Sequence, residues 1–105
     1  MALDQEREAA RVAEVFAALS HPRRVVILEC LLERERSVGD LVRCERLEPS
    51  TQSNTSQQLA VLRRAGLVKE RRDGNRVIYS AASPKLKELV KVASVLTHER
   101  VKALL

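Results

Sequence analysis

The chain contains one run of side chains suited to reading a nucleic acid, an uncharged stretch rich in hydroxyl and amide groups. Its eight consecutive members are Thr51, Gln52, Ser53, Asn54, Thr55, Ser56, Gln57 and Gln58. Glutamine and asparagine can form paired hydrogen bonds with adenine, and serine and threonine can donate to phosphate oxygens. The alternative reading is the polar first turn of a solvated helix, although such helices usually carry Glu and Lys pairs. The run therefore predicts a base-reading helix.

Basic residues gather on the C-terminal side of that run, around a predicted hairpin turn at Asp73-Gly74. Between residues 50 and 82 there are six basic and two acidic residues, so about a third of the chain carries +4 of the net +5. Arginines at an exposed hairpin tip can bind the phosphate backbone or enter a minor groove. A charged edge strand that blocks aggregation is the alternative. The candidates for DNA contact on this side are Arg63, Arg64, Arg71, Arg72, Asn75 and Arg76.

Hydrophobic spacing and turn residues predict the elements that must hold these side chains in place. Helices are expected over 3–19, 22–33, 38–44, 51–65 and from 84 to the C-terminus. Ser20 and a capping box at 37–40 should begin the second and third helices, and Gly66 should end the fourth. Strands are expected over 67–72 and 76–79. The prediction is one mostly α-helical domain over 1–105, with about five helices and a small two-stranded β-hairpin.

The order of these features is that of a helix-turn-helix followed by a wing, in which the second helix enters the major groove. Four stretches together resemble the ArsR family of bacterial and archaeal regulators: ALSHPRR (18–24), SVGDL (37–41), 53–66 with Val68, and RDGNRVIY (72–79). The resemblance extends over about 13–83. It implies a winged helix-turn-helix fold and a homodimeric repressor that releases operator DNA when a metal or another inducer binds.

Both terminal helices are expected to pair with a second copy of the chain, as the resemblance implies. A 105-residue monomer would leave much of the apolar surface of its final helix in water. The alternative is that this helix folds back on its own domain. We expect a homodimer because a palindromic operator requires a two-fold partner. The apolar residues of the final helix are Leu86, Leu89, Val90, Ala93, Leu96, Val101, Leu104 and Leu105.

The metal sites of the resembled family have no counterpart at the matching positions. The arsenic and cadmium branches carry Cys-x-Cys in the third helix, where this chain has Ser37 and Gly39. The zinc and nickel branches pair carboxylate and histidine ligands on the last helix, whereas His98 and Glu99 are adjacent here and point about 100° apart. His21 is expected to be a turn residue. No metal and no cofactor are therefore predicted.

Two cysteines, Cys30 and Cys44, remain as candidates for a redox-sensing site. Family members that sense persulfides or oxidants use one cysteine in the second helix and one in the last; Cys30 lies near the first position, and the second is missing. A disulfide between Cys30 and Cys44 would shift the recognition helix and requires Cα atoms within about 7 Å. The alternatives are a buried Cys30 with an incidental Cys44, an arsenite site with a third ligand, and a regulator without an inducer.

Composition and missing motifs narrow the function further. Aromatic residues form 2% of the chain, which disfavours the stacking platforms that bind single strands. No apolar run is long enough for a signal segment or a membrane span, so we expect a cytoplasmic protein with no membrane partner. No catalytic triad, phosphate-binding glycine loop or zinc signature occurs, and no enzyme is predicted.

We therefore predict a sequence-specific, dimeric repressor that binds a double-stranded DNA operator and answers to an unidentified small inducer or to thiol modification. A helical module whose basic hairpin binds acidic proteins is the alternative. Such a module would not need the neutral side chains of 51–58.

Overall fold

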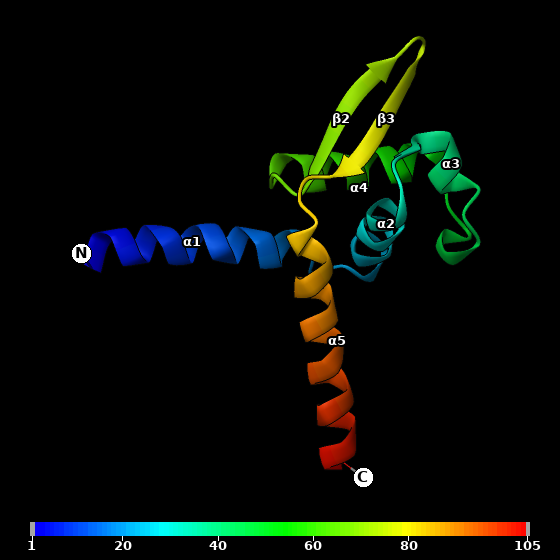
Figure 1. The fold of residues 1–105 in the computed structure, drawn as a ribbon. Coiled ribbons are helices and arrows are strands. Elements are labelled where there is room, and N and C mark those ends of the chain that lie inside the picture. The colour runs from blue at the N-terminus through cyan, green and yellow to red at the C-terminus, as the bar shows by residue number, and fades with distance from the viewer. Residues whose placement is uncertain (1, 105) are drawn as a thin grey trace.

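The computed structural model describes residues 2–104, so the two ends of the predicted domain, Met1 and Leu105, lie outside the described residues. Five α-helices, one short 3-10 helix and three strands follow one another along the chain (Figure 1). Their bounds are α1 (Ala2–Ala18), α2 (Pro22–Glu33), β1 (Arg36–Ser37), α3 (Val38–Val42), η1 (Glu45–Leu47), α4 (Gln52–Arg64), β2 (Val68–Asp73), β3 (Arg76–Ala81) and α5 (Lys85–Leu104).

The α2 helix forms the centre of the core because it is apolar on most of its surface. Pro22 occupies its first turn, where the missing backbone N–H costs nothing, and the helix begins at the predicted residue. Ser20 is not its cap: the Ser20 hydroxyl donates to the Ala17 carbonyl at 2.7 Å, and the His21 ring accepts from the Arg23 N–H at 3.2 Å. His21 thus acts as a turn and capping residue.

Aliphatic side chains from every part of the fold pack against α2. Each fully buried leucine contributes roughly 1.5–3 kcal/mol relative to an exposed one, so this cluster supplies most of the stability. The cluster places α3 and α4 at fixed positions on the α2 scaffold. Its main members are Ile27, Leu28, Leu31, Leu41, Leu47, Leu59, Leu62, Leu67 and Leu86.

The α3 helix is shorter than predicted. Its capping box is confirmed: Ser37 and Asp40 exchange hydrogen bonds between side chain and backbone at 3.0 and 3.1 Å. The helix ends at Val42 instead of near residue 44, and η1 follows. Leu47 of η1 is buried, which explains why the connection before α4 is longer than a simple turn.

Three antiparallel strands form a sheet in the order β1-β3-β2, where the sequence predicted only a hairpin. The third strand, β1, is two residues long and pairs with Ile78 and Tyr79 of β3, so it left no periodic signal. Within the hairpin, Asp73 still pairs with Arg76, and the turn itself is Gly74-Asn75. The positive φ of Gly66 (78°) and Gly74 (63°) explains a glycine at the end of α4 and at this turn.

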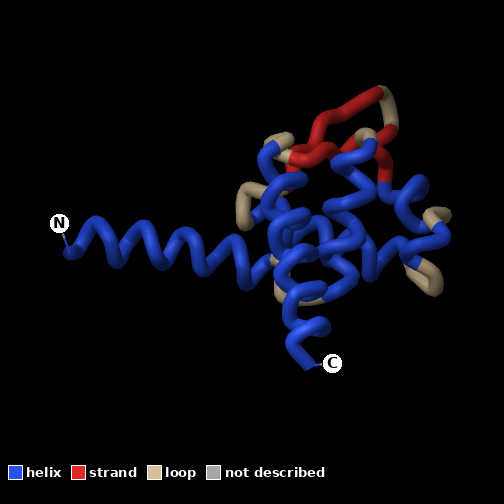
Figure 2. Tube along the Cα trace, turned by 60° about the horizontal axis from the view of Figure 1, so that its bottom comes forward, coloured by secondary structure: helices blue, strands red, loops and turns tan. Residues whose placement is uncertain are grey.

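The two terminal helices leave the body of the molecule. Most of α1 and the C-terminal half of α5 extend away from the rest of the chain (Figures 1 and 2). Both expose large apolar side chains to solvent, among them Leu3, Val12, Phe16, Val92, Val95, Leu96, Val101 and Leu104. Within residues 2–104, no helix is long and apolar enough to cross a membrane.

Candidate nucleic-acid interface

The N-terminal half of α4 presents the predicted polar run at the surface. Thr51 caps the helix, accepting a hydrogen bond from the Asn54 N–H at 3.1 Å. At about 100° per residue, Ser53, Gln57 and Arg64 share the face opposite the buried one. All three are exposed. The buried face consists of Thr55, Leu59 and Leu62.

One member of the run must be removed from the candidate DNA contacts. The Thr55 side chain is only 2% exposed and packs on the core side of α4, so it cannot reach a base. Its neighbours Gln52, Ser53, Asn54, Ser56 and Gln57 are exposed. Eight consecutive polar residues must place some side chains inward, because a helix rotates its side chains through every direction in two turns.

Gln58 has a second role at the side of the helix. Its Oε1 accepts a hydrogen bond from Arg24 at 3.0 Å, and the same guanidinium donates to the Ala18 carbonyl at 2.6 Å. Arg24 thereby ties α4 to the end of α1. Arg23, its neighbour, donates to the carbonyls of Leu47 and Pro49 at 2.6 and 2.5 Å and holds the linker before α4. Arg23 and Arg24 both extend from α2 and hold α4 in its position.

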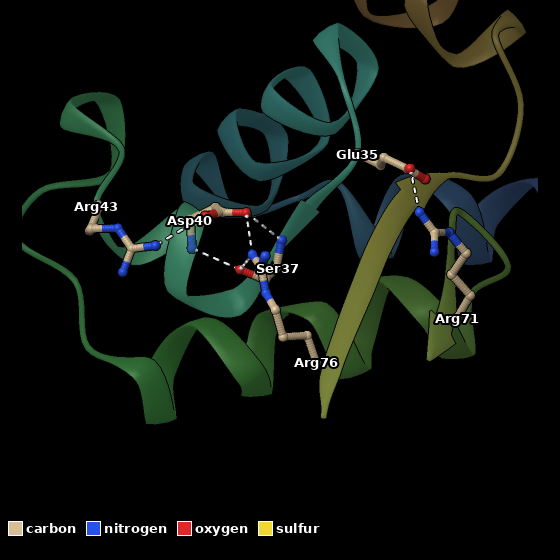
Figure 3. A network of polar contacts seen from close by, with 6 residues as sticks. All are labelled: Glu35, Ser37, Asp40, Arg43, Arg71 and Arg76. Carbon is tan, nitrogen blue, oxygen red and sulfur yellow. Dashed lines mark hydrogen bonds and ion pairs between the residues drawn. The ribbon is translucent and has the colours of Figure 1, made fainter. Parts of the chain in front are cut away.

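The hairpin is fastened to the start of α3 by an arginine network (Figure 3). Arg76 donates to the Ser37 hydroxyl at 3.0 Å and to Asp40 Oδ2 at 3.1 Å. Arg43 donates to the other oxygen of Asp40 at 3.0 Å. The backbone N–H of Ser37, with smaller contributions from the Ser37 hydroxyl and both guanidinium groups, holds the pKa of Asp40 below its usual value. Asp40 is therefore ionised at neutral pH and partly neutralises two arginines.

The remaining candidate arginines, in the hairpin and at the end of α4, differ in how freely they can bind a phosphate. Arg71 donates to Glu35 at 2.5 Å (Figure 3), and Arg63 donates to Glu70 at 3.1 Å. Arg72 is exposed and makes no ion pair or side-chain hydrogen bond within residues 2–104. The register places Arg71 and Arg76 on one face of the hairpin and Arg72 on the other.

A groove lies between the start of α4, the hairpin and α3. It is lined by side chains of all three elements, and most of these are polar or basic. The polar run and the basic hairpin, which are separate features of the sequence, therefore border one surface. The lining includes Gln52, Ser56, Asn75, Arg76, Asp40 and Arg43.

Known proteins share both this arrangement and the sequence that builds it. Residues 21–70 match a family model described as a bacterial regulatory protein of the arsR family. The chain is 57% identical over 82 residues to the HTH-type transcriptional regulator Rv0081 of Mycobacterium tuberculosis, which covers 77% of this chain and 69% of that protein. The crystal structure of Rv0081 superposes with a TM-score of 0.77 at 50% identity, covering 89% of this chain and 92% of that one.

The chain belongs to the ArsR family.

Two further relatives of this ArsR-family regulator are a repressor and a homodimeric DNA-binding domain. A biofilm growth-associated repressor of Xylella fastidiosa is 39% identical over 87 residues, covering 83% of this chain and 74% of the repressor. The homodimeric winged helix-turn-helix DNA-binding domain Mb0332 of Mycobacterium bovis superposes with a TM-score of 0.80 at 28% identity, covering 94% of this chain and 89% of that one. The predicted winged helix-turn-helix fold is thus confirmed, and the family is a class of transcriptional regulators rather than enzymes.

The fold of this ArsR-family protein also brings its two cysteines together. Cys30, in α2, is fully buried, and Cys44, between α3 and η1, is half-buried; their Sγ atoms are 3.6 Å apart, and both thiols are free. Among the described residues, no group of three His, Cys, Asp or Glu side chains is arranged to hold a metal ion.

The sequence did not predict the roles of several arginines that hold the site in position. Arg23 and Arg24 were noticed only as part of a motif, and Arg43 was not singled out at all. Their partners lie up to 34 residues away, and most are backbone carbonyls, which carry no side-chain signal. Only the excess of arginine in otherwise helical segments could have pointed to them.

Proposed function

We propose that this ArsR-family protein is a sequence-specific repressor that binds double-stranded operator DNA as a homodimer. The N-terminal half of α4 enters the major groove, and the hairpin lies along the adjacent phosphate backbone. The observation that carries this proposal is a groove lined both by the exposed, uncharged start of α4, through Gln52 and Ser56, and by Arg76 of the hairpin.

The side chains of α4 and of the hairpin suit different roles, base reading for α4 and phosphate binding for the hairpin. A major groove about 12 Å wide admits an α-helix, and amide side chains can read adenine there. Ser53 and Gln57 are one turn apart, so they can address neighbouring base pairs. Arg64 lies further along the same face of α4, about 16 Å from Ser53 at 1.5 Å per residue, where it suits a phosphate at the groove edge. Arg72 suits a phosphate beneath the hairpin.

Dimerisation is supported by the apolar surfaces of α1 and α5. Phe16 is 57% exposed and Leu96 58% exposed, and both lie on helices that leave the body of the molecule. Monomeric proteins rarely expose contiguous apolar patches of this kind. The relative from M. bovis is described as homodimeric. A two-fold pair would present two α4 helices to two half-sites of an operator.

Release from the operator would come from an inducer or from modification of a thiol. The thiol pair of Cys30 and Cys44 supports the second route, since Cys44 lies in the linker that leads to α4 and its sulfur is 3.6 Å from that of Cys30.

A titration of the reduced, full-length chain tests the proposal. Fluorescence anisotropy would compare a duplex from the gene's own upstream region with a shuffled duplex of equal length and composition. We expect roughly 10³-fold or greater preference for the upstream sequence at physiological salt. Equal affinities would refute sequence-specific binding. In a reporter fusion, removal of the protein should raise transcription; lower transcription would contradict repression.

Sedimentation velocity tests the dimer separately. Phe16→Glu should yield a monomer with weakened operator binding, because a charge would be buried in the apolar interface. Phe16→Leu, which keeps the surface apolar, is the matched control and should stay dimeric. A wild-type protein that is monomeric at micromolar concentration would contradict this part of the proposal.

A further inference from the structure

The strongest feature outside the DNA-binding surface is the pair of thiols that joins α2 to the connection between α3 and α4. Cys30 is part of the α2 scaffold, and its side chain is completely buried. Cys44 lies at the first position before η1 and is partly open to solvent. Their sulfur atoms are 3.6 Å apart without a covalent bond. The two side chains are thus already neighbours in the reduced protein.

We propose that Cys30 and Cys44 form a reversible intramolecular disulfide when the protein meets a hydroperoxide, and that this bond weakens operator binding. The regulatory part rests on the proposed function; the chemical part does not. This placement differs from a pair that joins α2 to the last helix, because no cysteine occurs in α5.

The surroundings give the two thiols different reactivity. Burial, reinforced by the hydrogen bond and charge of Cys44, raises the pKa of Cys30 to about 11. Burial acts in the same direction on Cys44, but hydrogen bonds from the Arg46 backbone, the Cys30 thiol and the Arg46 side chain outweigh it and leave its pKa lowered. Since the thiolate is the nucleophile, Cys44 is the group that reacts first. Its partial exposure also lets a small oxidant reach it.

The reaction balances in two steps. The Cys44 thiolate attacks one oxygen of the hydroperoxide; an S–O bond forms, the O–O bond breaks, and hydroxide or alkoxide leaves. The Cys30 thiol then attacks the sulfur of this sulfenic acid and loses its proton. The S–S bond forms as the S–O bond breaks, and the departing hydroxide takes up that proton to become water. Two electrons pass from the two sulfurs to the peroxide, and an added dithiol reverses the change.

The link to DNA binding runs through the linker between α3 and α4. A disulfide holds its sulfurs about 2.05 Å apart, so the two Sγ atoms must approach each other by roughly 1.5 Å. The Cys44 N–H donates to the Leu41 carbonyl at the end of α3, and its carbonyl accepts from the Leu47 N–H in η1, both at 3.0 Å. Movement of Cys44 is therefore transmitted to both sides of the turn.

Hydrogen bonds and an ion pair attach the linker between α3 and α4 to α2. The Arg23 guanidinium fixes the carbonyls of Leu47 and Pro49 to α2, and Arg46 pairs with Glu33 of α2 at 2.8 Å. The segment that sets the angle between α3 and α4 is thus already clamped to the helix that carries Cys30. When the two sulfur atoms form a bond, these contacts between the linker and α2 must rearrange. The rearrangement displaces α4 from its position in the reduced protein.

Intact mass, peptide mapping and anisotropy on one sample test the inference. The reduced, full-length protein would be treated with hydrogen peroxide. It should lose the mass of two hydrogen atoms, give a peptide pair joining Cys30 to Cys44, and bind the upstream duplex at least about fivefold more weakly, the lower end of typical coupling between sites. Dithiothreitol should restore both mass and affinity.

Single-thiol variants supply the controls. Cys44→Ser and Cys30→Ala should bind DNA like the reduced wild type and should not weaken on oxidation. In Cys30→Ala, dimedone should trap a sulfenic acid at Cys44, whereas Cys44→Ser should react much more slowly. Circular dichroism would verify that both variants fold. If Cys30→Ala does not fold, Cys44→Ser and Cys44→Ala, which also cannot form the disulfide, still test whether the loss of DNA affinity on oxidation requires it.

The possible outcomes distinguish failure of the disulfide inference from failure of the proposed repressor function. A missing Cys30–Cys44 peptide, an unchanged affinity after complete oxidation, or an equal loss of affinity in Cys44→Ser would overturn the inference while leaving the repressor intact. Absence of operator preference in the reduced protein would instead refute the proposed function and the regulatory half of the inference. The mass measurement decides the chemical half in either case.

Discussion

Replacement of Asp40 should have opposite effects on folding and on DNA binding. Asp40 accepts the Ser37 N–H at 3.0 Å in the capping box of α3 and pairs with Arg43 and Arg76 at 3.0 and 3.1 Å. Loss of such a cap costs about 1 kcal/mol. The arginine side chains are 73% and 58% exposed, so each pair adds only a few tenths, about 0.2–0.5 kcal/mol. Asp40→Ala should therefore lower the free energy of unfolding by about 1.5–2 kcal/mol.

The same substitution releases two guanidinium groups at the groove beside α4. Affinity for random DNA should rise, and log K against log salt should become steeper by about one unit for each new phosphate contact. Asp40→Asn keeps an acceptor for the Ser37 N–H, so it should show the DNA effect with a smaller loss of stability. Glu48→Ala, which removes an exposed carboxylate outside this network, controls for net charge.

Thermal unfolding and anisotropy at a fixed protein concentration would measure the two effects. A change of 1 kcal/mol shifts Tm by roughly 4–8 °C in a domain of this size. The pKa of Asp40 is lowered in the folded state, so its contribution is complete above the unfolded pKa of about 3.9 and disappears as the pH falls through the folded value. The wild type and Asp40→Ala should therefore converge in acid. Weaker DNA binding by Asp40→Ala, or a constant stability difference down to pH 2, would refute the reasoning.

Three further predictions concern individual contacts. Arg72→Ala should weaken binding to operator and random DNA alike and flatten the salt dependence by about one unit, as anisotropy at several salt concentrations would show; an unchanged slope would place Arg72 off the DNA. Gln57→Ala should cost ~1–3 kcal/mol on the operator and little on random DNA, and equal losses on both would reject base reading by Gln57. Leu59→Ala, at a fully buried position, should lower stability by about 2–5 kcal/mol in chemical denaturation; a loss under 1 kcal/mol would contradict the close packing of Leu59 in the core.

Patterns with a strong local cause were predictable from the sequence. The bounds of α2, the capping box at Ser37 and the left-handed glycine after α4 follow from short-range rules, and the structure has all three. The polar run of α4 was visible because it departs from the charged composition of ordinary surface helices. Its division into exposed residues and the buried Thr55 depended on which face meets the core, and this is a tertiary property.

Features created by packing were not predictable. The β1 strand exists because Arg36 and Ser37 happen to lie beside β3, and two residues cannot show a period. Cys30 and Cys44 were candidates by residue type alone; their 3.6 Å separation results from η1 folding back onto α2. The ion pair of Arg71 with Glu35 likewise joins residues 36 positions apart.

Mapping the DNA contact surface by NMR tests the central claim most directly. A reduced, isotope-labelled protein would be titrated with the upstream duplex, and amide shifts would be followed along the whole chain. The largest changes should occur at Ser53, Gln57 and Arg72, with small changes in the exposed parts of α1 and α5. Changes centred on α1 or α5, with the first half of α4 unaffected, would contradict the assignment of α4 and the hairpin as the DNA-binding surface.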